Sequence, residues 1–249
     1  MIPVRDHNPS ERTPFVLYAL IAANIGAFLI YSPYLADPRL FSAFLEEWAL
    51  IPARITAGEG FETIFSSMFL HAGLLHLGGN MLFLWIFGDN MEDAFGHIGF
   101  LLFYLAAGMA AALAQYAMAP GSGVPMVGAS GAVAGVLGGY LLLFPRAKVD
   151  VLVILIVFIG LVALPAWLVL GVWFALQVLG GVTTLGAEGG GVAIAAHGGG
   201  FLAGFALALP FWIARGGPAF WKRSEGHPPH PATRVTRRLS PVPRVGRRR

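Results

Sequence analysis

Cysteine is absent from this chain of 249 residues, and charged side chains are scarce. Without cysteine, disulfides and thiolate chemistry are excluded. Charged residues make up 12% of the sequence and hydrophobic residues 57%, whereas a soluble domain carries roughly 25% charge. Too few polar side chains remain to cover a water-soluble globule. Long apolar runs separate the charges, and a helix needs roughly 20 such residues to cross a bilayer, so we predict a polytopic membrane protein.

Six apolar segments of helical length predict an all-α bundle of six transmembrane helices. They cover residues 15–31, 74–91, 98–118, 130–144, a stretch within 151–181, and 192–213. Glycine and alanine are frequent within them, and small residues let helices approach closely in lipid. The spans divide the chain into an N-terminal segment (1–13), a membrane domain (14–214) and a basic tail (215–249).

The fifth region carries no charge between Asp150 and Glu188, and Pro165 divides it. We expect residues 151–164 to be a partly interfacial entry segment and Pro165 to lie in the first turn of the span, where proline is tolerated. Six spans place both termini on one side, together with fourteen of the sixteen Lys and Arg residues. Basic residues gather on the cytoplasmic side of membrane proteins, so both termini are predicted to be cytoplasmic. A seventh span would break this pattern.

The tail holds ten of the sixteen Lys and Arg residues, from Arg215 onwards, and many prolines. This composition predicts disorder. The tail is either drawn to anionic membrane lipids or is a solvated segment that only fixes topology. We do not expect it to bind nucleic acid.

Polar side chains within or beside the spans are few, and such residues mark functional sites by default because they are costly in lipid. The candidate site residues among them are His71, His76, Asn80, Gln115, Ser130, Gln177 and His197. The predicted directions of the spans bring three separate helices, with their polar groups, to the same outer-leaflet depth. None of these residues is Asp, Glu, Lys or Arg, which ion-coupled carriers usually need. A transporter or channel is therefore the weaker interpretation.

Ser130 lies in Gly128-Ala129-Ser130-Gly131, at the start of a span of about 15 residues. A span this short begins below the membrane surface, and the preceding loop is expected to enter the membrane to reach its first residue. The free N–H groups of a helix N-terminus are suited to holding an oxyanion. The nucleophile elbow of soluble hydrolases requires G-x-S-x-G, and position 132 is alanine. By itself, such a serine is usually a packing residue.

One helical face of the last span carries His197, Gly200 and Gly204, and the fourth span offers Gly131, Gly135 and Gly139 at matching spacing. Two such faces can pack backbone against backbone. Ser130 and His197 would then meet, and histidine is the usual base for a serine.

His76 and Asn80 lie four residues apart on one helical face and can both donate hydrogen bonds. Such donors either stabilise an oxyanion or form a polar clasp between helices. Carboxylates are predicted elsewhere, with Glu92 and Asp93 at the inner end and Glu188 in the last outer loop. The sequence therefore permits a Ser-His dyad but not a triad.

Three motifs, in this order, resemble the rhomboid intramembrane proteases over about residues 65–211. They are His71-x4-His76-x3-Asn80, Gly128-x-Ser130-Gly131 and His197-x2-Gly200-x3-Gly204. The resemblance implies a six-helix core in a bacterial inner membrane, and a serine endopeptidase that cuts transmembrane segments of other proteins without metal or cofactor. It also implies that Ser130 is the nucleophile and His197 the base, with an oxyanion hole formed by Asn80, His76 and the Ser130 amide.

Two positions depart from the family pattern. Many members carry a Trp-Arg pair in the first loop, where this chain has Glu62 and Thr63. Some place a tyrosine one turn after the serine, stacked on the histidine, where this chain has Ala134. The remaining alternative, a membrane chaperone that binds helices without cleaving them, would not need Ser130 and His197 together.

Overall fold

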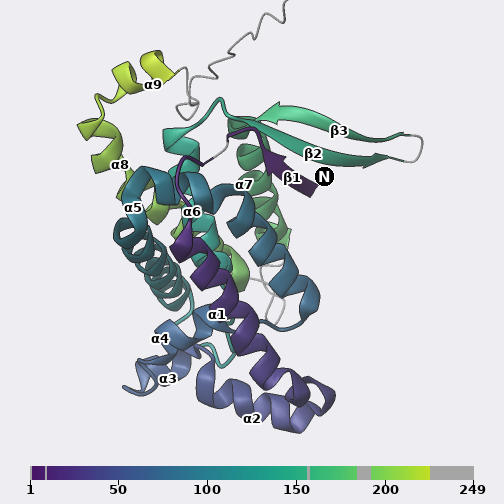
Figure 1. Ribbon diagram of the computed structural model, residues 1–249. Helices are drawn as coiled ribbons and strands as arrows, with labels where there is room; N and C mark the ends of the chain where they lie inside the picture. The colour runs from purple at the N-terminus through teal and green to yellow at the C-terminus, as the bar shows by residue number, and fades with distance from the viewer. Residues whose placement is uncertain (1, 9, 156–157, 184–191, 225–249) are drawn as a thin grey trace, which may run out of the picture.

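The computed structural model describes residues 2–8, 10–155, 158–183 and 192–224 as a bundle of apolar helices with a small sheet at one end (Figure 1). The helices and strands are β1 (Ile2–Asp6), α1 (Phe15–Tyr31), the 3-10 helix η1 (Ser32–Ala36), α2 (Pro38–Trp48), α3 (Pro52–Thr56), α4 (Thr63–Ser66), the 3-10 helix η2 (Ser67–Phe69), α5 (Leu74–Met118), α6 (Ser130–Leu143), β2 (Lys148–Leu155), β3 (Phe158–Pro165), α7 (Ala166–Thr183), α8 (Val192–Ala214) and α9 (Pro218–Ser224).

Three helical stretches among the described residues are long and apolar enough to cross a membrane: Phe15–Ala36, Leu74–Met118 and Ile194–Ala214. The apolar helices α6 and α7 are shorter. Within α5, Gly96 has a φ of 71°, a conformation that glycine adopts readily, so two helices meet there at a kink. The polytopic helical class is confirmed, and the number of six spans stays a prediction.

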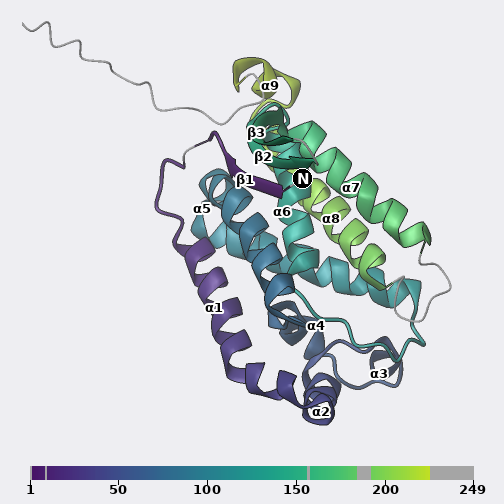
Figure 2. The same cartoon turned by 90° about the vertical axis from the view of Figure 1, so that its right-hand side faces the viewer.

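The two ends of the bundle differ. The sheet and α9 lie at one end, and the short helices of the first loop, α2 to α4, lie at the other (Figures 1 and 2). β1 and α9 therefore share an end, which is the arrangement expected if both flanks of the membrane domain lie on the same side of the bilayer.

Helix α6 forms the core of the bundle. Twelve of its 14 residues are buried, and it packs against α5 and α8. A helix that is apolar all round is typically buried by its neighbours, and glycine and alanine along α6 let those neighbours come close.

Glycines of α6 and α8 pack backbone against backbone. A Cβ added at Gly200 would overlap the carbonyl oxygen of Gly131, and one added at Gly204 would overlap that of Gly135. These contacts confirm the predicted pairing of the two glycine faces, except at Gly139.

Gly139 faces α5, where an added Cβ would meet Met91 and Phe103. The reason is geometric: residues four apart on a helix of 3.6 residues per turn drift by about 40° at each step. After two steps from Gly131 the stripe has turned away from α8. Gly138 takes its place, with the backbone of Phe201 against it.

Two carboxylates, one on α5 and one on β2, hold the N-terminal segment at the end of the bundle that carries the sheet. Glu92 accepts hydrogen bonds from the N–H groups of Val16 and Leu17, at 3.0 and 2.7 Å. These N–H groups belong to the first turn of α1 and have no acceptor within the helix, so Glu92 caps α1 from α5. Asp150 likewise binds the side chains of Arg5, at 2.7 Å, and His7, at 2.6 Å.

The region expected to enter the membrane as an interfacial segment is a β-hairpin. β2 pairs with both β1 and β3 in antiparallel register, giving the order β1-β2-β3. Pro165 ends β3 and α7 begins at Ala166, so the predicted boundary is displaced by one residue. A continuous apolar run has no period with which to distinguish strand from helix, which explains why the hairpin was missed.

The tail predicted for 215–249 begins with the short helix α9, which the sequence analysis did not predict. In α9, the indole N–H of Trp221 donates a hydrogen bond to the carbonyl oxygen of Leu142 at 2.9 Å. Residues 225–249, which hold most of the predicted tail, lie outside the described residues.

We expect Gly204→Ala to lower the unfolding temperature in detergent, because a methyl group there would overlap Gly135. Overpacking of this kind costs about 1–3 kcal/mol, more than the roughly 0.5–1 kcal/mol that alanine gains over glycine inside a helix. Gly26→Ala on α1 is the matched control, since a Cβ there meets no described atom within 4 Å. Equal unfolding temperatures for the two variants would contradict the close packing.

Candidate active site

Ser130 begins α6, two residues after a glycine that allows the chain to turn there. Gly128 has a φ of +131°, and its N–H donates to the carbonyl oxygen of Ser67 at 2.9 Å. A Cβ at Gly128 would lie 2.9 Å from the His76 ring and 3.3 Å from Ser130 Oγ. The glycine therefore lets the backbone pass close to both side chains, and any larger residue would strain this turn.

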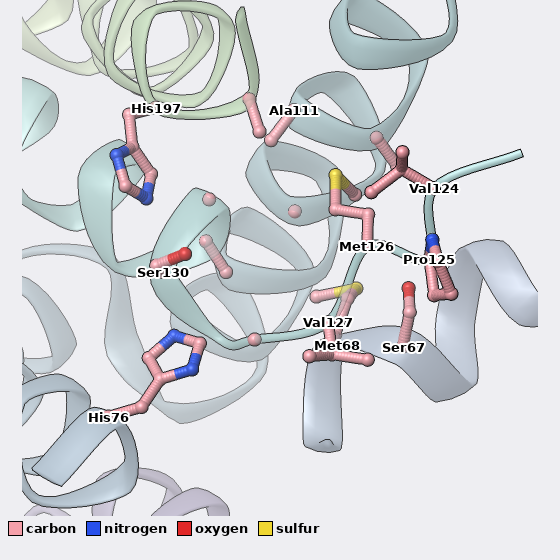
Figure 3. A pocket seen from close by; sticks show the side chains of 16 residues that line it. Ser67, Met68, His76, Ala111, Val124, Pro125, Met126, Val127, Ser130 and His197 are labelled. Carbon is pink, nitrogen blue, oxygen red and sulfur yellow. The ribbon is translucent and has the colours of Figure 1, made fainter. Parts of the chain in front are cut away.

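Three of the four predicted site residues line one cavity of about 230 Å³: Ser130 from α6, His76 from α5 and His197 from α8. In Figure 3 the Ser130 hydroxyl lies between the rings of His197 and His76. All three residues are half-buried. Three helices thus bring one hydroxyl and two imidazoles together at one cavity.

The loop before α6 also lines this cavity, through Val124, Pro125, Met126 and Val127. Met126 and Leu50 exchange backbone hydrogen bonds of 2.8 and 3.1 Å, which join this loop to the first loop. The predicted approach of the loop to Ser130 is confirmed. Sequence analysis missed Ser67 and Met68, which line the cavity from η2, because neither stands in a recognisable polar pattern.

Asn80, the fourth predicted residue, does not line the cavity among the described residues. It is buried one turn after His76 on α5, and its Nδ2 donates to no described acceptor. A buried amide donor without a partner costs about 1–3 kcal/mol. Buried polar groups are nearly always hydrogen-bonded, so this donor is available to a bound water or ligand.

His71 lies beside the site and outside α5. Its ring is edge-on to that of His76, with centroids 5.2 Å apart, and its backbone N–H and carbonyl both bind the Tyr31 hydroxyl, at 2.5 and 2.8 Å. Burial and the nearby His76 lower the pKa of His71 to about 4, so the ring is neutral at pH 7. The position of the His71 ring indicates that it packs against the His76 ring and supports it.

His197 has a partner that the sequence analysis did not assign. Its Nδ1 lies 2.8 Å from Oε1 of Gln177 on α7, and its ring lies 6.1 Å from that of Trp173 on the same helix. Gln177 was recognised only as a polar residue within a span. Glu188, the carboxylate predicted for the last outer loop, lies outside the described residues.

The first loop is ordered at the position where it departs from the family pattern. Thr63 is buried at the start of α4, and its hydroxyl donates to the carbonyl oxygen of Gly60 at 2.6 Å. Thr63 therefore holds the turn before α4 at this position.

The fold and the cavity together define a polytopic helical membrane protein with a polar site enclosed by its helices. A match to the Rhomboid domain covers residues 58–214. This match spans more than half of the chain, which therefore belongs to the rhomboid family.

Several relatives show the same similarity. The chain is 34% identical over 175 residues to RHOMBOID-like protein 4 of Arabidopsis thaliana, which covers 66% of this chain and 40% of that protein. It is 32% identical over 142 residues to Rhomboid protein 1, mitochondrial, of Saccharomyces cerevisiae, covering 54% and 38%. It is 44% identical over 72 residues to Rhomboid protease GluP of Bacillus subtilis, covering 29% and 14%. The matches span less than half the length of each of these relatives.

Proposed function

We propose that this protein is an intramembrane serine endopeptidase that cleaves transmembrane segments of other membrane proteins. The observation that carries the proposal is the meeting of Ser130, His197 and His76, from three helices, at one cavity. A hydroxyl beside an imidazole is the arrangement of an activated serine nucleophile. Membership of the rhomboid family, and similarity to a relative named as a protease, support the same chemistry.

In the proposed reaction, Ser130 Oγ attacks the carbonyl carbon of the scissile peptide bond while His197 Nε2 takes the hydroxyl proton. The C–N bond then breaks, and His197 gives this proton to the leaving amine. Water attacks the resulting ester with His197 again as base, and the C–Oγ bond breaks as the proton returns to Ser130. The cycle restores the enzyme and needs no metal or cofactor.

The negative charge that develops on the carbonyl oxygen requires hydrogen-bond donors. We assign this role to the Ser130 backbone N–H, to His76 and to Asn80. The N–H of a first helical residue has no acceptor within its helix, and Asn80 Nδ2 has none among the described residues. A substrate oxyanion would supply the missing acceptor.

The proposed setting is a bacterial inner membrane, with both termini cytoplasmic, transmembrane proteins as substrates and lipid around the bundle. The basic residues of the flanks favour this orientation. A transporter or a non-catalytic helix-binding protein would have no use for an activated serine, so a serine-reactive fluorophosphonate probe separates these functions. Labelling at Ser130 is expected.

We expect Ser130→Ala and His197→Ala each to abolish both fluorophosphonate labelling and cleavage of a model transmembrane substrate. The double variant should be no worse than either single one, because members of one catalytic unit are not additive. Unfolding temperatures close to that of the wild type serve as the control. Substantial cleavage by Ser130→Ala would overturn the assignment.

Asn80→Ala is expected to lower kcat by about 10²–10³ and to leave measurable activity, since one oxyanion donor is worth this much and two others remain. Cleavage rates over a range of substrate concentrations measure this effect. A change in KM with kcat intact would instead show that Asn80 binds substrate and does not stabilise the oxyanion.

Good substrates should carry glycine or proline in the outer part of their transmembrane segment. A helical peptide cannot present its carbonyl group to Ser130, because each C=O is bonded within the helix, and these residues weaken helices by about 1–3 kcal/mol. The measurement is the cleavage rate of one substrate before and after its glycines and prolines are replaced by leucine. An unchanged or faster rate would refute the need for unwinding.

A further inference from the structure

The imidazole of His197 is held from one side by α7, which runs beside α8 (Figures 1 and 2). Its Nδ1 lies 2.8 Å from Gln177 Oε1. An amide oxygen can only accept a hydrogen bond, so a hydrogen bond at this contact requires the tautomer of His197 that carries its proton on Nδ1. The Nε2 atom then has its lone pair free, as a base for Ser130 requires.

A second contact comes from the preceding turn of α7. Trp173 and Gln177 are four residues apart and so share a helical face, and the indole of Trp173 lies 6.1 Å from the His197 ring. Trp173 is itself packed between Phe83 of α5 and Phe201 of α8, with centroids 6.2 and 6.4 Å away. The histidine is therefore supported by a fixed indole as well as by an amide.

These contacts take the place of the tyrosine that some family members carry one turn after the serine. Ala134, one turn after Ser130, is buried in the packed core of α6 and has no ring to offer. In this chain the aromatic neighbour and the hydrogen-bond acceptor of His197 both come from α7.

We propose that Gln177 is a positioning residue that fixes the Nδ1–H tautomer and the orientation of His197, with Trp173 packed against the ring. The proposal rests on the proposed function, in which His197 is the base. Gln177 occupies the place that a carboxylate takes in a Ser-His-Asp triad, but it does so as a neutral group. It does not touch the reacting atoms.

The first test is the kinetics of Gln177→Met, which keeps the approximate length of the side chain and removes the acceptor. We expect kcat to fall by about 10- to 100-fold, by analogy with the loss seen when the partner that orients a metal-binding histidine is removed, with KM nearly unchanged. Gln177→Glu, whose side chain keeps an oxygen acceptor even when the carboxyl group is protonated, should recover most of the rate. The readouts are cleavage of a model substrate and the rate of fluorophosphonate labelling.

Gln115→Met is the matched control. Gln115 is also buried within the bundle, on α5, but its Oε1 has no described donor and it does not line the cavity. This variant should keep the wild-type kcat at a similar unfolding temperature. An unchanged kcat in Gln177→Met would overturn the proposal, as would equal losses in Gln177→Met and Gln115→Met or a loss in Gln177→Met that Gln177→Glu does not recover.

The second test does not depend on activity. 15N NMR of histidine-labelled protein distinguishes the two imidazole tautomers, and the His197 signal is identified as the one missing from His197→Ala. The wild type should show Nδ1 protonated and Nε2 unprotonated, and Gln177→Met should show a mixture. A protonated Nε2 in the wild type would overturn the positioning role. A wild type that neither cleaves nor labels would overturn the proposed function, while the tautomer would still decide the role of Gln177.

Discussion

The backbone contact between α6 and α8 is the constraint on which the site depends. Gly200 and Gly204 lie so close to the carbonyl groups of Gly131 and Gly135 that no side chain fits between the helices. Lipid supplies no hydrophobic force between helices, so association rests on such close packing. The contact also sets the register: Ser130 directly precedes Gly131, and His197 lies within one turn before Gly200. A side chain added between the helices would move His197 away from Ser130.

Polar contacts at the opposite end of α6 fix the same helix along its axis. The Tyr140 hydroxyl donates to Asp6 at 2.8 Å and accepts from Asn8 Nδ2 at 2.7 Å. Burial raises the pKa of Asp6 to about 6. α6 is thus held by side-chain hydrogen bonds at one end and by glycine packing near the other. The polar groups of the two ends stay separated by the apolar middle of the helix.

The sequence predicted those features that repeat with the period of a helix. Ser130, His76 and His197 are predicted at one depth because spans of predicted length and direction carry them, and in the structure all three line one cavity. The hairpin was missed because a wholly apolar run has no period, although Val149, Val151 and Val153 give it the β-branched content of a strand. The contact of Gln177 with His197 depends on how α7 is rotated about its axis. Packing decides that rotation, and no pattern within α7 reveals it.

The groups around Ser130 are neutral, as is expected for a site within an apolar bundle. No Asp, Glu, Lys or Arg side chain lines the cavity in the described part of the chain. A carboxylate beside the histidine would have to be kept ionised away from water, at a cost of several kcal/mol in desolvation. The amide of Gln177 carries no such penalty, yet its oxygen still faces the Nδ1–H of His197. In the proposed reaction, it would stabilise the imidazolium formed when His197 takes the proton of Ser130, at the stage where stabilisation lowers the barrier.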